Sequence, residues 1–456
     1  MGYYLVNMAE NSIFKSYDIR GRYPLEINEE IVYKIGQALV KFLKANTLAV
    51  GYDIRPSSKN LTEALIKGVI SQGCDVVNIG AVPSGLVSLA VFQQKLDGGV
   101  MISASHLGKN YNGLKLINSL AQPIALDSGL EKIEKMIQKE IPLSPEKGYL
   151  HQKDISYDYL NFLFNFTDPK SISPLKIVLD ASAGPINRFA SAVFAELFCQ
   201  VTKINFHPND KFFDHNLNPL LKESQREAKK EILSQRADLG VIWDGDADRA
   251  IFLDEEGKFV EPYFITALLA EIILEENPKA KILYDPRLTW AIEETVKKNG
   301  GIPVISKAGW SNFLPKMLKE KILFGGEASG HYFFLRENFV IGDGLIPVLL
   351  ILKHLSQTRK KLSQLAEPFR QKYFISGERN FKIHSPEKLL KALEQKYSDA
   401  LKISHLDGLI VEYKDWRFNL RPSQTEPLMR LNIEAKSQVL LKEKIRELEK
   451  IINSYS

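Results

Sequence analysis

Three aspartates alternate along the hexapeptide Asp244-Gly-Asp-Ala-Asp-Arg249. Alternate carboxylates on a tight turn can converge on one hard cation, and the apolar segments on either side would hold that turn rigid. An EF-hand calcium loop does not fit, because Arg249 stands where that loop needs glycine. A solvated acidic hairpin turn is the structural alternative. Since Arg249 adds a donor suited to phosphate oxygens, the segment predicts a divalent-metal site beside a phosphate.

Ser105 and His106 follow the apolar residues 99–103 and precede a loop rich in glycine and asparagine. Such a loop exposes a hydroxyl and presents backbone N–H groups. An ordinary polar exit from a strand would explain a lone Ser-His dipeptide as well, because neighbours in sequence do not form a catalytic pair by default. On its own residues, this segment leaves both explanations open.

Two further segments carry polar groups that suit phosphates and sugars. Arg421-Pro-Ser-Gln-Thr-Glu-Pro427, followed by Arg430, combines arginine, hydroxyl, amide and backbone N–H donors, which together would hold a phosphate. A capped helix start explains it equally well. Gly325-Gly-Glu-Ala-Ser-Gly-His331 offers close backbone approach and polar side chains that suit sugar hydroxyls, although a glycine-rich turn is its structural alternative.

Alternating strand-like and helix-like patterns must position these segments. Strands are predicted at residues 47–52, 75–79 and 99–103, with amphipathic helices between them. This is the βαβαβ pattern of an open α/β sheet, in which ligands gather beyond the carboxyl ends of the strands. The pattern restarts near residues 175 and 263 and changes after residue 371. We therefore expect three α/β domains at residues 1–151, 152–257 and 258–371, and a smaller α+β domain at residues 372–456.

Composition excludes several classes of protein. The 456 residues are 45% hydrophobic and 25% charged, which is ordinary for a globular chain and unlike a disordered or fibrous one. The net charge of +5 comes from 60 basic and 55 acidic residues without a basic stripe or tail, so no nucleic-acid partner is expected. Two cysteines and no signal peptide or membrane span predict a cytoplasmic protein in a reducing compartment.

The four polar segments fall one in each predicted domain, and together they resemble the α-D-phosphohexomutase family, specifically its bacterial phosphomannomutase/phosphoglucomutase group. The resemblance runs from Phe14-Lys-Ser-Tyr-Asp-Ile-Arg-Gly21 to Arg430, in the family's order. It implies a heart-shaped arrangement of three similar α/β domains and one smaller domain around a central cleft. It also implies interconversion of hexose 1-phosphate and hexose 6-phosphate through a hexose 1,6-bisphosphate, in a monomer or a homodimer.

The resemblance further implies a role for each site residue. Ser105 would carry the phosphoryl group and, with Asp244, Asp246 and Asp248, ligate one Mg²⁺. Arg20, Lys115 and Arg249 would surround the transferring group, with Lys115 or His106 near the proton that moves. The residues that would bind or line the site for the sugar phosphate are Tyr17, Arg287, Lys307, Glu327, Ser329, His331, Arg421, Ser423, Gln424, Thr425 and Arg430.

Three departures from the family pattern bear on these roles. Leu107 and Gly108 replace the usual Asn-Pro after the serine and histidine, which puts the rigidity of that loop in question. Ala247 replaces a glycine of the metal loop, a change that alanine accepts where φ stays negative. Trp310 replaces a histidine and would either stack on the sugar or pack against the protein.

Two rival functions stay open on the sequence. A phosphoglucosamine mutase shares the same layout, although Phe14 to Gly21 and the segment Tyr111-Asn-Gly-Leu-Lys115 look more like the phosphomannomutase side. A catalytically silent sugar-phosphate-binding paralogue is the rival from another class. Retention of the serine, the three aspartates and the phosphate-binding arginines argues against it.

Overall fold

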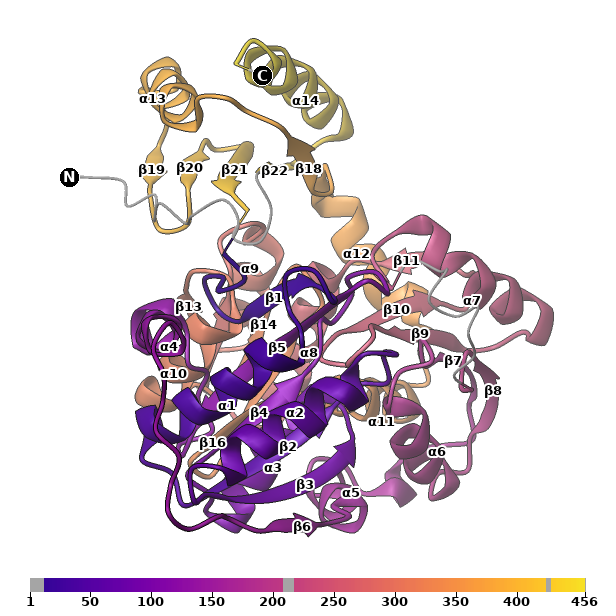
Figure 1. Cartoon of the computed structure of the whole chain (residues 1–456). Coiled ribbons are helices and arrows are strands. Elements are labelled where there is room, and N and C mark those ends of the chain that lie inside the picture. The colour runs from indigo at the N-terminus through magenta and orange to yellow at the C-terminus, as the bar shows by residue number, and fades with distance from the viewer. Residues whose placement is uncertain (1–11, 208–216, 424–427, 456) are drawn as a thin grey trace.

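The computed structural model describes residues 12–207, 217–423 and 428–455. Within these residues the chain forms four units, each built on one β-sheet, which we call domains I to IV in chain order (Figure 1). The predicted α/β class is confirmed. The domain boundaries at residues 151, 257 and 371 and the cleft at the centre stay predictions.

Domain I contains a mixed sheet with the strand order β1-β5-β4-β2-β3-β6. Its central strand β2 places Leu48 and Val50 in a core with α1 and α2, whereas Ala49 faces a second core with α3. Helices therefore cover both faces, as expected for parallel strands with continuous apolar runs. The elements are β1 (Ile19–Arg22), α1 (Glu29–Leu43), β2 (Thr47–Tyr52), α2 (Ser58–Ile70), β3 (Asp75–Ala81), α3 (Ser84–Gln94), β4 (Gly98–Ile102), β5 (Tyr111–Asn118), α4 (Leu130–Ile137) and β6 (Leu150–Gln152).

Domains II and III repeat the same strand plan, with orders β11-β10-β9-β7-β8 and β13-β12-β14-β15-β16. The elements of domain II are α5 (Ser156–Phe164), β7 (Lys176–Asp180), α6 (Ile186–Ala195), β8 (Gln200–Ile204), α7 (Lys222–Gln235), β9 (Leu239–Trp243), β10 (Ala250–Asp254) and β11 (Phe259–Val260). Those of domain III are α8 (Pro262–Glu276), β12 (Lys281–Tyr284), α9 (Trp290–Lys298), β13 (Ile302–Ile305), α10 (Trp310–Glu320), β14 (Phe324–Gly326), β15 (Tyr332–Arg336), β16 (Phe339–Gly342), α11 (Ile346–Thr358) and α12 (Leu362–Lys372).

One strand plan therefore recurs three times. The central strands β2, β7 and β12 each pair in parallel with two neighbours. One of those neighbours (β4, β9 or β14) then pairs with an antiparallel strand (β5, β10 or β15). The domain-scale repetition places the loops after β4, β9 and β14 at equivalent positions in the three sheets.

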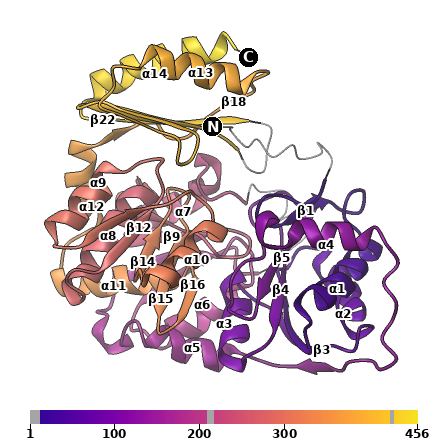
Figure 2. The same ribbon diagram turned by 90° about the vertical axis from the view of Figure 1, so that its left-hand side faces the viewer.

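Domain IV is an antiparallel sheet with the order β17-β22-β21-β20-β19 and with β18 also paired to β22. Helices α13 and α14 lie together on one face of this sheet, and the sheet stands between them and domain III (Figure 2). The elements are β17 (Phe374–Ile375), β18 (Arg379–Phe381), α13 (Pro386–Lys396), β19 (Lys402–Ser404), β20 (Leu409–Glu412), β21 (Trp416–Pro422), β22 (Met429–Ala435) and α14 (Gln438–Asn453).

The hydrophobic cores divide the molecule differently from the sheets. One core runs through domains I, II and III and contains Leu86 of α3, Phe189 of α6 and Phe264 of α8. At Gly85 a β-carbon would come within 2.4 Å of the carbonyl oxygen of Gly342, so α3 and β16 pack closely across two domains. Domain IV has a separate core around Phe418. Across the described ranges, no helix combines the length and the apolar character needed to cross a bilayer.

Candidate active site

Three of the predicted loops occupy the same place in three sheets. Ser105 follows β4, Asp244 follows β9 and Glu327 follows β14. Each of these strands is parallel to the central strand of its sheet, and each loop leads back into an antiparallel strand. Ligands of open α/β sheets gather at such carboxyl ends. One backbone plan therefore delivers three chemically different loops.

The Ser105 hydroxyl faces the metal loop of domain II. Its Oγ donates a hydrogen bond to Asp244 Oδ2 at 2.7 Å and lies 3.2 Å from His106 Nδ1. Ser105 is buried and has a φ of 51°, in the left-handed region that costs non-glycine residues about 1–2 kcal/mol. The surrounding structure must therefore hold this loop in place.

The three aspartates of the metal loop converge. One carboxylate oxygen from each of Asp244, Asp246 and Asp248 lies within 4.8 Å of the other two. Burial raises the pKa of Asp244 to about 7, and the charges of Asp248 and Asp246 add to the rise. Asp246 Oδ1 is buried and, among the described residues, has no hydrogen-bond partner.

These residues fit a divalent cation such as Mg²⁺. The donor set consists of carboxylate oxygens and the Ser105 hydroxyl, which are the hard ligands that Mg²⁺ prefers. A bound cation would offset the repulsion among the three buried carboxylates and would occupy Asp246 Oδ1.

Lys115 already pairs with two members of this cluster. Its Nζ lies 2.7 Å from both Asp246 Oδ2 and Asp248 Oδ2, and it donates to Ser84 Oγ at 3.0 Å. The lysine extends from β5, the strand after the serine loop, and its side chain is almost fully buried. It therefore links β5 and α3 of domain I to the metal loop of domain II as a fixed cation.

Two arginines complete the charge pattern. Arg249 Nε lies 3.6 Å from Asp244 Oδ2, and Arg20 is held by Asp18 through contacts of 2.8 and 2.9 Å. Burial lowers the pKa of His106 well below its usual range, and the charges of Arg249 and Arg20 lower it further. His106 is therefore a neutral imidazole between positive groups, next to the serine oxygen.

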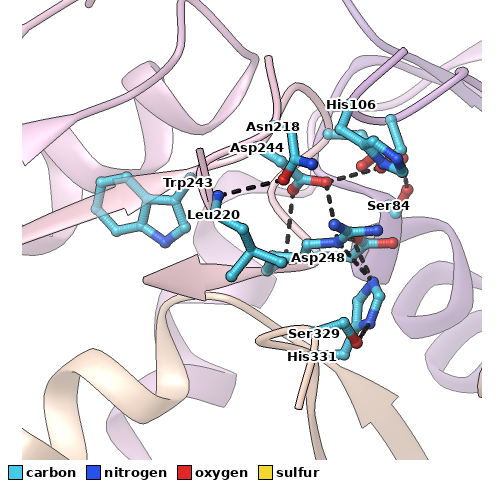
Figure 3. Close-up of polar contacts among 12 residues, drawn as sticks. Ser84, His106, Asn218, Leu220, Trp243, Asp244, Asp248, Ser329 and His331 are labelled. Carbon is cyan, nitrogen blue, oxygen red and sulfur yellow. Dashed lines mark hydrogen bonds and ion pairs between the residues drawn. The ribbon is translucent and has the colours of Figure 1, made fainter. Parts of the chain in front are cut away.

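His331 connects the metal loop with the loop after β14, residues 327–331, which we call the sugar loop after its predicted role. Its Nδ1 lies 2.8 Å from Glu327 Oε2. Its Nε2 lies 3.3 Å from Asp248 Oδ1 (Figure 3). Arg249 and His331 also form a backbone bridge between domains II and III. Burial by itself would lower the pKa of His331, but Asp248 and Glu327 outweigh it and raise the pKa to about 9.

Glu327 is the buried carboxylate of the sugar loop. It accepts hydrogen bonds from the Gly309 N–H and from Ser329 Oγ, the latter at 3.1 Å. Burial by itself would raise its pKa, but the hydrogen bond and charge of His331 outweigh burial and lower the pKa to about 2. Arg287 reaches the same loop, because its terminal nitrogen donates to Ser329 Oγ at 3.3 Å.

The two arginines that are predicted to bind phosphate lie in domain IV, on neighbouring strands. Arg421 is the last residue but one of β21, pairs in register with Arg430 of β22, and is buried. Its side chain lies 3.9 Å from Glu378 and 4.0 Å from Asp407, while Arg430 pairs with Glu378 at 3.0 Å. Ser423 follows on the same segment, and the predicted residues Gln424 and Thr425 lie outside the described residues.

Residues of domains I and III lie close to the region around Arg421 and Asp407. Asp407 accepts a hydrogen bond from the N–H of Ala308 in domain III at 3.3 Å. A β-carbon on Gly309 would lie 3.2 Å from the ring of Tyr17, so Tyr17 of domain I packs against this turn. Burial raises the pKa of Tyr17, which stays protonated. Lys307 is exposed just beyond the end of β13.

The structure resolves two of the departures from the family pattern. Ala247 has a φ of 55°, so the condition of a negative φ is not met and alanine adopts a strained left-handed conformation in the metal loop. Trp310 begins α10 and packs against two hydrophobic cores, which accounts for it as a packing residue.

Sequence reasoning missed several polar residues of the site. Ser84 donates to Asp246 Oδ2 at 2.7 Å from the start of α3, and no signal in the sequence ties it to a metal loop 162 residues away. Glu378 and Asp407 were missed for the same reason. Their only sequence signal was position, since each flanks a glycine in the region after residue 371.

Comparisons with known proteins identify relatives over nearly the whole chain. Family models for domains I, II and III of phosphoglucomutase/phosphomannomutase match residues 11–143, 157–257 and 261–373, and the model for its C-terminal domain matches residues 378–450. A phosphomannomutase of Escherichia coli (strain K12) is 37% identical, over 98% of this chain and 100% of its own length.

Solved structures are similar over the same length. A phosphoglucomutase/phosphomannomutase family protein from Burkholderia thailandensis has a TM-score of 0.86 and 26% identity, and the match covers 98% of each chain. An N-acetylphosphoglucosamine mutase of Aspergillus fumigatus, solved with GlcNAc-6P and magnesium, shares the fold with a TM-score of 0.62 at 13% identity, over 98% of this chain and 97% of its own. With all four domain models matched in order, the chain belongs to the phosphoglucomutase/phosphomannomutase family.

Proposed function

We propose that this chain is a phosphohexomutase that interconverts the 1-phosphate and 6-phosphate of mannose, of glucose or of both. The observation that carries the proposal is the hydrogen bond from Ser105 Oγ to Asp244 Oδ2, at 2.7 Å across two domains. It places a hydroxyl that can carry a phosphoryl group at the edge of a carboxylate cluster that fits a divalent cation. A silent sugar-binding protein has no need of that contact.

Each half-reaction moves one phosphoryl group. The C6 hydroxyl of a hexose 1-phosphate attacks the phosphorus on Ser105, so an O6–P bond forms while the Oγ–P bond breaks. The hexose 1,6-bisphosphate then reorients and returns its other phosphoryl group to Ser105 through the reverse exchange. In the first half the attacking sugar hydroxyl loses its proton and the departing Ser105 Oγ gains one. In the second half Ser105 Oγ loses its proton as it attacks, and the departing sugar oxygen gains one.

The chain's own residues would divide this work. Ser105, Asp244, Asp246 and Asp248 would hold the cation, which when bound neutralises charge on the transferring group. Arg249 would add a donor to the equatorial phosphoryl oxygens, because it already lies against Asp244. His106 lies within 3.2 Å of Ser105 Oγ, whereas Lys115 is engaged by two carboxylates, so His106 is the better placed group for the moving proton.

The remaining residues would bind the substrate. Glu327 and Ser329 would accept and donate hydrogen bonds to sugar hydroxyls, while Arg421 and Arg430 would hold the phosphate that is not transferred. One binding site must accept either end of the sugar, which favours recognition through the phosphate and through hydroxyls that glucose and mannose share. His331 and Arg287 would hold the sugar loop at a fixed position relative to the metal loop.

The test is the mass of the intact protein and its change with substrate. Purified protein is expected to carry one phosphoryl group on Ser105, lost when hexose phosphate is added and restored by hexose 1,6-bisphosphate. The Ser105→Ala variant should lack that mass and lose at least about 10⁴-fold in turnover, while calorimetry still detects hexose 1-phosphate binding. Near-normal turnover by this variant would rule out the phosphoserine. Turnover of glucose, mannose and glucosamine 1-phosphates compared side by side would identify the preferred sugar.

A further inference from the structure

Arg55 is a buried charged residue that the reaction described above does not use. It stands in the segment Asp53-Ile-Arg55 at the exit of β2, the central strand of domain I. Its Nε donates to Asp53 Oδ2 at 2.9 Å, and its own backbone N–H donates to Asp53 Oδ1 at 3.1 Å. Ser58 Oγ donates to the same carboxylate at 2.5 Å. Because both charges are almost fully buried, the guanidinium is fixed in one orientation.

The free edge of this guanidinium faces the serine loop. One terminal nitrogen donates to the carbonyl oxygen of Ser105, and the other donates to those of Gly108 at 2.8 Å and Tyr111 at 3.1 Å. These carbonyls span the loop from its catalytic serine to the first residue of β5. A single planar side chain thus holds both ends and the middle of the loop.

This loop needs an external support. Ser105 has a φ of 51°, and Gly108 replaces a residue that would have stiffened the loop. A β-carbon on Gly245 would lie 2.6 Å from the Ser105 carbonyl oxygen, so the metal loop packs directly against the serine backbone. A small shift of Ser105 would therefore change its Oγ position relative to Asp244.

In the other two α/β domains, a residue just after the central strand also donates a hydrogen bond to the loop that carries the predicted chemistry or to the residue beside it. In domain III, Asp285-Pro-Arg287 leaves the central strand β12, and Arg287 pairs with Asp285 at 2.8 Å and donates to Ser329 in the loop after β14. In domain II, Ser182 follows the central strand β7, and its Oγ donates at 2.5 Å to the Trp243 carbonyl beside the metal loop. In each domain the exit of the central strand supports the loop that carries the chemistry.

We propose that Arg55 is a positioning residue for phosphoryl transfer. By holding three carbonyls of the serine loop, it keeps Ser105 Oγ aligned with the metal loop, and it does so without touching the substrate. This inference rests on the proposed function. Its consequence is a selective loss of kcat when Arg55 is changed, because the phosphate-binding arginines lie in a different domain with a separate core.

The experiment compares Arg55→Lys with Arg370→Lys in the full chain. A lysine ammonium cannot reach three carbonyls and Asp53 together, so Arg55→Lys should lower kcat and the rate of phosphoserine loss on mixing with hexose 1-phosphate by about 10–100-fold. KM should change by less than about threefold. Arg370 is the matched control, because it pairs with Asp254 at 2.9 Å and donates to the Phe259 carbonyl at 2.9 Å, away from the serine loop.

Chemical rescue separates positioning from general stability. Arg55→Ala leaves a space shaped for a guanidinium, so millimolar guanidinium chloride should restore part of its kcat, whereas methylammonium chloride should not. A folded Arg55→Lys variant with wild-type kcat would overturn the inference, and so would a loss that tracks the melting temperature as it does in Arg370→Lys. If wild-type Ser105 never carries phosphate, the proposed function fails first. If it does and Arg55→Lys transfers it at the normal rate, only the role of Arg55 fails.

Discussion

Charged side chains form close ion pairs in one region of the site and lie farther from their partners in another. We call Ser105, Lys115, Arg249 and the aspartates at 244, 246 and 248 the transfer centre, and Arg421, Ser423 and Arg430 the phosphate grip. In the transfer centre, Lys115 lies 2.7 Å from each of two aspartates. In the phosphate grip, the nearest carboxylates to Arg421 lie at 3.9 and 4.0 Å, and its buried Nε has no hydrogen-bond partner among the described residues.

The comparison shows which ligand would satisfy the unpartnered buried atoms of each region. A buried donor without a partner costs about 1–3 kcal/mol, which a phosphate oxygen at the phosphate grip would recover on binding. In the transfer centre the buried Asp246 Oδ1 has no hydrogen-bond partner among the described residues, and it is an acceptor that a cation would satisfy. This centre sits where domains I, II and III share one core. The phosphate grip belongs to a domain with its own core, joined to domain III through Arg417, which donates to the carbonyls of Pro286 and Arg287 at 2.7 and 3.0 Å.

Metal removal should give the largest effect, confined to the transfer centre. Chelating divalent cations is expected to lower turnover by about 10³-fold, because several kcal/mol of charge stabilisation are lost from the transition state. Added Mg²⁺ should restore it. Asp246→Asn should lower turnover to a similar extent, and added Mg²⁺ should not restore the turnover of this variant. Calorimetry should still detect hexose 1-phosphate binding after chelation, and loss of that binding would show that the two regions are not separable.

Arg421→Ala should affect the phosphate grip alone. Loss of a charge-assisted hydrogen bond costs about 1.5–3 kcal/mol, so KM for hexose 1-phosphate should rise about 10–150-fold with little change in kcat. Arg379→Ala is the matched control, because Arg379 pairs with Glu449 on the outer side of the same domain. An equal fall in kcat with unchanged KM would contradict the division between binding and transfer.

The local elements and the chemical loops could be predicted from the sequence, whereas the contacts between them could not. A strand at residues 47–52 and a helix between the strands at 75–79 and 99–103 were predicted from the sequence pattern, and β2 (Thr47–Tyr52) and α3 (Ser84–Gln94) match them. The aspartates of the metal loop stand in one hexapeptide, so their convergence follows from a single turn. Ser84 reaches Asp246 across 162 residues, and that contact depends on packing between two domains.

Two other failures have local physical causes. The left-handed conformation of Ala247 was not predictable from residue type, because alanine itself disfavours it and only the surrounding loop imposes it. The supporting role of Arg55 was missed because the three carbonyls that it binds carry no side-chain signal. Sequence patterns report side-chain chemistry, and here the decisive partners are backbone atoms.

Glu378→Gln should produce a smaller change, in the opposite direction to Arg421→Ala. The Glu378 carboxylate lies 3.0 Å from Arg430 and 3.9 Å from Arg421, where it competes with an incoming phosphate. Removing a partly exposed ion pair of about 0.2–1 kcal/mol should lower KM by up to about fivefold and leave kcat unchanged. Steady-state kinetics at two salt concentrations checks this, since salt should narrow the difference. A rise in KM would mean that Glu378 orients the arginines instead of competing for them.

The smallest effect on turnover is expected at Asp180, which is the last residue of β7 and lies two residues before Ser182. Burial raises the pKa of this carboxyl from 3.8 to about 7. A raised folded-state pKa means that the folded protein holds the proton more tightly than the unfolded chain, so the contribution to stability is complete below about pH 4 and is lost as pH rises to about 7. The loss approaches about 4 kcal/mol at about 1.4 kcal/mol per pKa unit.

Asp180→Asn should remove that pH dependence while keeping the local contacts. The Ser182 N–H and Asn205 Nδ2 both donate to Asp180 Oδ1, at 2.9 and 3.1 Å, and an amide oxygen can accept both. Urea unfolding between pH 4 and 8 should therefore show a flatter profile for the variant, with greater stability than the wild type above pH 7 and unchanged turnover at 25 °C. Asp238→Asn is the control, because that carboxylate accepts from the Lys176 N–H at the exposed opposite end of β7. If Asp180→Asn lowers turnover, the Asp180 carboxylate also supports the transfer centre. The ion pairs within the transfer centre would then not be sufficient to hold its residues in position.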